Sequence, residues 1–233
     1  MNVLILVFQF IIGLVIGSFL GAFTYRFPRG TSIGEGRSKC PDCKNIIFWY
    51  DNIPLFSYLF LHGKCRNCKN IISYRYPIIE LSAAIVFVFI GFNLINLVIA
   101  SILIAIFVID VEYQLIFDEF IFVGLLIVLS SFIFLNNQMV FSNILSGFIA
   151  SLLLLSLNLI TKGKGMGLGD VKLALFLGPL IGIDLFLNWL FFSFLAGAIV
   201  GIVLIIGKKA TMKQKIAFGP FLIIGLVLAL LIK

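Results

Sequence analysis

The chain has 233 residues, of which 62% are hydrophobic and 12% are charged, and its formal net charge is +7. A soluble domain carries about 25% charged residues, so the composition excludes an ordinary soluble protein and indicates that lipid is the solvent for most of the chain. Nucleic-acid binding is not expected either, because the basic residues lie in loops between apolar segments, as determinants of membrane topology do.

Eight apolar segments are predicted to be spanning helices, since a span needs about 20 residues. The first occupies residues 1–25, and its apolar run has neither a basic n-region nor a small-residue cleavage site, so no cleaved signal peptide is expected. The others lie at about 78–95, 96–113, 119–135, 140–160, 169–184, 186–207 and 216–232. The joints near Asn93 and near Gly182 are weak, which leaves seven or nine spans open.

The predicted fold is therefore an all-α polytopic membrane protein with a small soluble loop domain between its first two helices. Its parts are the first helix (1–25), the loop domain (26–77) and a membrane domain of about seven helices (78–233). With eight spans, all basic clusters fall on one side of the membrane, and basic loops mark the cytoplasmic face. The N-terminus is accordingly expected outside and the loop domain in the cytoplasm.

Two Cys-x-x-Cys pairs occupy the loop domain, namely Cys40, Cys43, Cys65 and Cys68. Two such pairs about twenty residues apart are typical of a four-cysteine zinc site, which is structural because no ligand position stays open. A segment of this size also needs a staple to fold. A pair of disulfides, redox use or free thiols are the alternatives, and a reducing cytosol disfavours the disulfides.

Two aspartates lie at the predicted cytoplasmic edge of the membrane, where a buried charge is costly and therefore indicates a structural or functional role. Asp110 follows the apolar run 102–109, and Asp170 opens a helix after the glycine-rich segment 165–169. Asp170 alone can be a helix cap or complement the helix dipole. Together the two aspartates can hydrolyse a peptide, because one ionised carboxylate activates water while the protonated partner polarises the carbonyl. His62, the only histidine, has no catalytic partner set.

Several motifs resemble those of the type IV prepilin peptidases, a family of Gly-x-Gly-Asp intramembrane aspartic proteases. They are Gly167-Leu-Gly169-Asp170, the acids Asp110 and Asp118, the four cysteines with the surrounding loop from Asn52 to Glu80, the opening Gly17-Ser-Phe-Leu, and Phe218-Gly-Pro-Phe. Phe117, Gly21 and Ala217 depart from residues that are common in the family.

The resemblance implies that Asp110 and Asp170 are the catalytic pair of an enzyme in the bacterial inner membrane. It implies prepilin or pseudopilin substrates, cleaved after a short basic leader at the cytoplasmic face. It also implies N-methylation of the new terminus with S-adenosylmethionine, whose binding residues the sequence does not identify. The pilin system served and the oligomeric state are equally undetermined.

Two other functions are compatible with parts of the sequence. One is a membrane transporter or assembly scaffold in which the acids bind ions or cap helices; a transporter would favour internal repeats and acids near the midplane. The other is a peptidase that has lost methylation.

Overall fold

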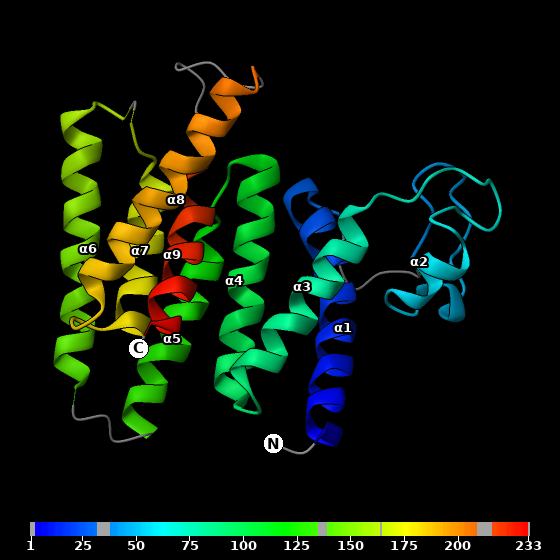
Figure 1. Ribbon diagram of the computed structural model, residues 1–233, viewed down its shortest axis with the longest axis horizontal. Coiled ribbons are helices and arrows are strands. Elements are labelled where there is room, and N and C mark those ends of the chain that lie inside the picture. Colours follow the sequence, from blue (N-terminus) through cyan, green and yellow to red (C-terminus); the bar gives the residue numbers. More distant parts are fainter. Residues whose placement is uncertain (1–2, 32–37, 135–138, 164, 209–215, 233) are drawn as a thin grey trace. The chain divides into compact units, whose positions relative to one another are not determined.

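The computed structural model describes residues 3–31, 38–134, 139–163, 165–208 and 216–232. Within these residues the regular structure is helical, apart from two isolated β-bridges in the cysteine-bearing loop (Figure 1). The chain forms two compact units, residues 1–105 and 106–233.

The first unit contains a closely packed helix pair, α1 (Val3–Arg26) and α3 (Arg75–Ile90). Two glycines of α1 allow the contact: a Cβ on Gly13 would lie 2.5 Å from the Cα of Ala84, and one on Gly17 would lie 2.7 Å from the Cα of Glu80. Small residues let helices approach closely in lipid, where packing rather than the hydrophobic effect drives association. The loop between the two helices contains the short helix α2 (Phe56–Phe60) and 3-10 turns at Phe27–Arg29 and Trp49–Asn52.

The second unit is a helix bundle formed around α7 (Leu168–Ile181). This helix packs against α5 (Asp118–Phe134), α6 (Val140–Ile160), α8 (Phe186–Ile206) and α9 (Gly219–Leu231), and most of its side chains are buried. The last residues of α4 (Leu94–Tyr113) also belong to this unit. A helix surrounded by other helices can be short, because protein rather than lipid covers it.

Glycines bring the neighbouring helices close to α7. Gly124 of α5 makes room for the ring of Phe176, and Gly178 lies directly against Gly147 of α6. The hydroxyl of Ser146 donates to the carbonyl of Gly178 at 2.7 Å and ties the same two helices together. The close contacts fix α7, and with it Asp170, inside the bundle.

A helix lies at each of the eight predicted segments, with boundaries that differ by a few residues. Gly91 and Gly182 end α3 and α7 with φ of +79° and +72°, a conformation that glycine adopts at little cost. By length and composition, four helices among the described residues can cross a membrane: α1, α4, α6 and α8. The helices at the other four predicted segments, α3, α5, α7 and α9, have 16, 17, 14 and 13 residues.

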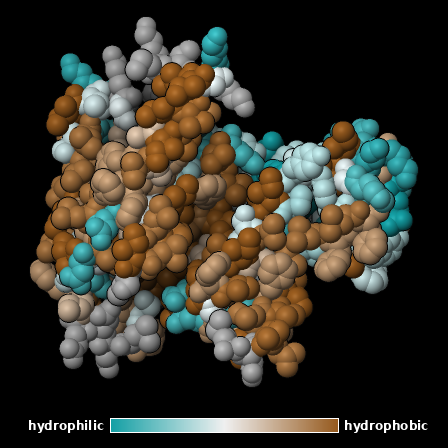
Figure 2. Space-filling model, viewed as in Figure 1, coloured by the Kyte–Doolittle hydropathy of each residue, from teal (hydrophilic) through white to brown (hydrophobic). Residues whose placement is uncertain are grey.

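The protein is thus an all-helical, polytopic membrane protein, and the count of eight spans stays a prediction. On the face shown in Figure 2, hydrophobic residues cover the helices, while hydrophilic residues gather over the cysteine-bearing loop. This contrast agrees with a chain that exposes its helices to lipid and its loop to water.

Candidate active site and cysteine module

Two buried carboxyl groups lie in the second unit at the ends of different helices. Asp110 is in the last turn of α4 with 4% of its surface exposed, and Asp170 is in the first turn of α7 with 8% exposed. Burying an isolated charge is costly, so such groups need hydrogen-bond donors, opposite charge or a proton. Their surroundings show which of these the protein supplies.

The first donor comes from the glycine-rich turn that precedes α7. The backbone N–H of Gly167 donates to Oδ2 of Asp170 at 3.1 Å, which is the acidic half of a capping box. The side-chain amide of the buried Asn158 on α6 holds this turn by donating to the carbonyl of Met166 at 2.5 Å. Asp170 therefore does act as a helix cap through one oxygen, and the turn that positions it is itself anchored.

The second donor is the backbone N–H of Gly219 at the start of α9, which interacts with the carboxyl groups of both Asp110 and Asp170. A Cβ at this position would collide with Oδ2 of Asp110 and lie 3.2 Å from Cδ1 of Ile116 and 3.3 Å from Cδ2 of Leu173. Only glycine lets the α9 backbone approach the aspartates so closely.

The start of α9 directs this single donor to the aspartates. The N–H groups of Phe221 and Leu222 both donate to the carbonyl of Phe218, at 3.0 and 3.2 Å, and Pro220 has no N–H. Gly219 therefore supplies the first-turn donor at the carboxyl groups. The positive end of the helix dipole lies there too and favours negative charge.

The two carboxyl groups are close enough for the charge of Asp170 to act on Asp110. Oδ2 of Asp110 is buried and has no hydrogen-bond partner within the described ranges. Carboxyl groups whose charges repel one another do not both ionise readily, and such a pair can share one proton. An ionised and a protonated carboxyl side by side can activate water and polarise a carbonyl group.

Asp118, eight residues after Asp110, lies outside this pair. It accepts hydrogen bonds from Nζ of Lys172 at 2.7 and 2.8 Å, and both side chains are exposed. This ion pair links the first residue of α5 to the second turn of α7. Exposed ion pairs contribute about 0–1 kcal/mol to folding stability, so this pair stabilises the packing of the two helices only slightly.

The four cysteines of the first unit lie in two knuckles of the same design. In the first, Cys40 N–H donates to Asn45 O, and Lys44 N–H donates to Cys40 O, both at 3.0 Å. Cys65, Lys69 and Asn70 repeat this pattern at the same spacing, with distances of 2.8 and 3.0 Å. The lysine in each knuckle has a left-handed backbone, with φ of 61° and 62°.

The knuckles bring all four sulfur atoms within 4.8 Å of one another, and those of Cys40 and Cys68 are 3.8 Å apart. Zn–S bonds of about 2.3 Å in a tetrahedron place the sulfurs roughly 3.8 Å apart, so the cluster can hold a metal ion. All four cysteines are free thiols. The backbone N–H of Cys68 lowers the pKa of the Cys65 thiol to about 7, which favours the thiolate that a metal binds.

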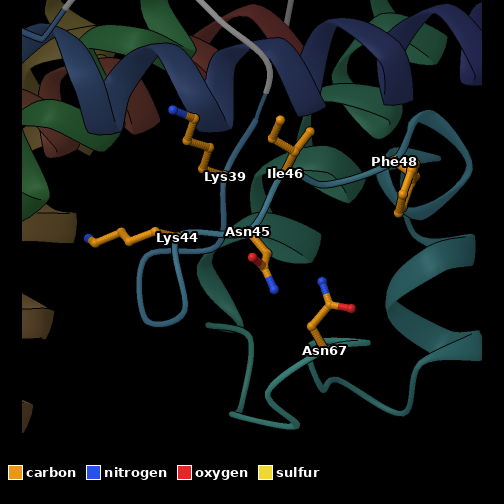
Figure 3. A pocket seen from close by; sticks show the side chains of 6 residues that line it. All are labelled: Lys39, Lys44, Asn45, Ile46, Phe48 and Asn67. Atoms are coloured by element: carbon orange, nitrogen blue, oxygen red, sulfur yellow. The ribbon is translucent and has the colours of Figure 1, made fainter.

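An open hollow on the surface of the module lies between the knuckles (Figure 3). Asn45 from the first knuckle and Asn67 from the second point toward one another across it. Lys39, Lys44, Ile46 and Phe48 complete its lining. The hollow is therefore lined by residues from both knuckles.

Sequence reasoning selected Asp110, Asp170 and the four cysteines, and the structure places the aspartates around one backbone N–H and the cysteines in one cluster. The sequence patterns alone assigned no role in the site to Gly219 or Asn158. A Gly-Pro pair at the start of a helix is a usable signal for Gly219, because proline is favoured in the first turn and glycine permits close approach. Nothing in the sequence marks Asn158, whose role depends on helix packing.

Two family models together match most of the chain. The Bacterial Peptidase A24 N-terminal domain matches residues 11–94, and the Type IV leader peptidase family matches residues 97–202. The first therefore covers the cysteine module, and the second covers both aspartates.

Curated relatives match over most of their length. A protein of Bacillus subtilis (strain 168) is 32% identical over 95% of this chain and 92% of its own. One of Pectobacterium carotovorum subsp. carotovorum is 30% identical over 92% and 88%, and one of Vibrio cholerae is 35% identical over 78% and 79%. Each is named prepilin leader peptidase/N-methyltransferase. No solved structure matches the chain significantly.

Proposed function

Because the chain belongs to the type IV leader peptidase family, we propose that it cleaves the leader peptides of prepilins and pseudopilins with Asp110 and Asp170, and then methylates the new N-terminus. The observation that carries the catalytic assignment is that both buried carboxyl groups meet the N–H of Gly219. The family match favours this function over a transporter or an assembly scaffold.

In the proposed cleavage, the ionised aspartate takes a proton from water while the protonated one donates a hydrogen bond to the scissile carbonyl oxygen. Water oxygen bonds to the carbonyl carbon, and the carbonyl oxygen takes up the proton. When the C–N bond breaks, the leaving nitrogen receives the proton abstracted from water, and the second proton returns to the pair. Gly219 N–H and the α9 dipole stabilise the charge that stays on the pair.

We also propose the orientation and parts inferred from the sequence. The protein has eight spans in the bacterial inner membrane, with the N-terminus outside and the cysteine module in the cytoplasm. The parts are the first helix at 1–25, the module at 26–77 and the peptidase membrane domain at 78–233. The one-sided distribution of basic residues supports this topology, which places the ends of α4 and α7 that bear the aspartates at the cytoplasmic edge.

The metal held by Cys40, Cys43, Cys65 and Cys68 is proposed to be a structural zinc ion. The mutual distances of the sulfurs and the lowered pKa of the Cys65 thiol support a closed four-thiolate site. For methylation, S-adenosylmethionine supplies an activated methyl group when bound. The name shared by the relatives supports that donor.

The peptidase proposal is tested by replacing Asp110 or Asp170 with Asn in the purified full-length protein. Each change removes a proton donor or acceptor with little change of shape, so cleavage of a prepilin should fall by about 10³-fold or more. Asp184→Asn, at an exposed position between α7 and α8, makes the same exchange away from the site and should retain activity. Methylation of a substrate processed beforehand reports whether each variant is folded. A folded variant of Asp110 or Asp170 with near-normal cleavage would contradict the proposed pair.

A further inference from the structure

A third buried carboxylate lies in the first unit and takes no part in the proposed cleavage. Glu80, in the second turn of α3, has 7% of its surface exposed. An ionisable side chain on a membrane helix is costly and marks a functional site by default. Its partners show what kind of site it is suited to form.

Glu80 joins three segments that are far apart in the sequence. Its Oε2 accepts a hydrogen bond from the backbone N–H of Leu55 at 2.8 Å, and the hydroxyl of Ser18 on α1 interacts with the same carboxylate. Gly17 allows this approach by leaving α1 in close contact with the Glu80 backbone. Ser18 lies in the motif Gly17-Ser-Phe-Leu, and Leu55 and Glu80 lie in the loop motif from Asn52 to Glu80. The proposed leader cleavage uses none of these three residues.

Both donors to Glu80 are neutral. Among the described residues, no basic side chain forms an ion pair with this carboxylate or acts on it electrostatically. A buried anion is normally paired with a cation or a metal. Within the described part of the chain, Glu80 therefore has donors that orient it but no positively charged partner.

The turn held by Glu80 is unusual. Leu55 has φ of 59° and ψ of −48°, a conformation that non-glycine residues rarely adopt and that surrounding contacts must enforce. Ile53 and Phe56, on either side of this turn, are 43% and 57% exposed. Glu80 is therefore a fixed carboxylate beside a turn with exposed apolar side chains, a combination that suits a ligand with both a positive charge and an apolar part.

We propose that Glu80 binds the α-ammonium group of the processed substrate and accepts its proton for N-methylation. The product of leader cleavage is a hydrophobic helix that begins with such an ammonium group, which matches a buried anion flanked by apolar residues. This inference depends on the proposed methylation activity but not on Asp110 or Asp170.

The chemistry balances with the methyl donor already named. The ammonium group gives one proton to Glu80 and becomes a nucleophilic amine. Its nitrogen then bonds to the methyl carbon as the carbon–sulfur bond of the donor breaks and the sulfur keeps the electron pair. Glu80 releases its proton to water when the methylated product leaves.

The test compares two peptides that correspond to the processed substrate, one with a free N-terminus and one N-acetylated, for binding to full-length protein in detergent without methyl donor. Wild-type protein should bind the free amine about tenfold more tightly or better, the value of a charge-assisted hydrogen bond. Glu80→Gln should lose this preference. Glutamine keeps an oxygen that can accept the Leu55 N–H, so the turn can persist.

Rates on the two substrates separate this role from a structural one. In Glu80→Gln, methylation of the processed peptide should fall by about 10²-fold or more, as expected for loss of a general base, while leader cleavage stays within about threefold of wild type. Asp184→Asn is the matched acid-to-amide control and should change neither rate.

The proposal is overturned if Glu80→Gln still prefers the free amine, weakens binding of both peptides equally, or loses cleavage together with methylation. It is also overturned if the variant loses affinity for S-adenosylmethionine alone and retains the peptide preference. Failure of the aspartate pair would appear in the cleavage rates of the Asp110 and Asp170 variants, so the two proposals fail independently.

Discussion

The cysteine module and the aspartate pair solve the same electrostatic problem in different ways. Each gathers side chains that carry or develop negative charge. The cysteines come from two local turns with identical backbone hydrogen bonds, and a metal ion can neutralise four thiolates. The aspartates come from separate helices, α4 and α7, where the backbone N–H groups of Gly167 and Gly219 interact with them and a shared proton can reduce their charge.

The difference shows where each site is vulnerable. The module is expected to depend on the proposed metal ion, because its short turns bury little apolar surface. The aspartate pair depends on helix packing, because Gly219 reaches it only if α9 is held in place. Trp189 of α8 provides that hold by donating from Nε1 to the carbonyl of Leu222 at 2.9 Å.

The largest expected effect is loss of the module on removal of its metal. Replacing Cys40 and Cys68 with Ser, or adding a strong chelator, should abolish the binding of about one zinc ion per chain, which is worth about 10 kcal/mol or more of folding free energy in small zinc domains. The amides of Lys44 and Lys69 should lose protection in hydrogen exchange, while amides of α7 stay protected. Metal-free protein with unchanged protection in the knuckles would show that the cluster needs no metal.

Gly219→Ala should break the other site without touching the module. Its Cβ would collide with Oδ2 of Asp110, so the carboxylate or α9 must move and the N–H contact weakens. Loss of one preorganised donor lowers kcat by about 10²-fold, measured as initial rates of leader cleavage, with zinc content unchanged.

Gly201→Ala on α8 is the control for this change, since a Cβ there meets nothing within 4 Å. If Gly219→Ala cleaves as fast as this control while both proteins are folded, the N–H of Gly219 has no part in cleavage.

The two sites should respond differently to pH. The pKa of Cys65 is lowered to about 7 in the folded module, so its stabilising contribution is complete above the ordinary thiol pKa and is lost as the pH falls through 7. Zinc affinity should therefore drop by about tenfold per pH unit below 7 for this one thiol, in a competition titration with a zinc indicator.

Cleavage should instead pass through a maximum, because the aspartate pair works with one proton and fails with two or none. The pH–rate profile of zinc-loaded protein measures this directly. A cleavage rate that rises continuously with pH would speak against a shared proton.

The smallest effect is expected at the exposed pair of Asp118 and Lys172. A double-mutant cycle with Asp118→Asn and Lys172→Met should give a coupling energy of about 0.2–1 kcal/mol, measured from thermal unfolding. Cleavage by either single variant should stay within about threefold of wild type. A large loss of cleavage activity would show that Asp118 takes part in catalysis as well as in the ion pair.

Sequence reasoning located the helices well, because long apolar runs and their basic flanks are local signals. The end of α3 was predicted a few residues late, since the apolar pattern continues past Gly91 and only the backbone conformation of that glycine ends the helix. The four cysteines were equally readable, because each knuckle is defined by spacing alone. The lengths of the helices were predicted less well, because packing inside the bundle permits α7 to have only 14 residues.

The sequence by itself indicated that the chain spans a membrane, that its cysteines can form one metal site, and that Asp110 and Asp170 are acids at the edge of predicted spans. It indicated these because hydrophobicity, spacing and the cost of buried charge act through residues near one another in the chain. Only the tertiary structure decided that Gly219 meets both aspartates, that Asn158 anchors the turn before Asp170, and that Glu80 joins Leu55 and Ser18. Those contacts join helices and loops distant in sequence, where packing geometry alone decides which groups meet.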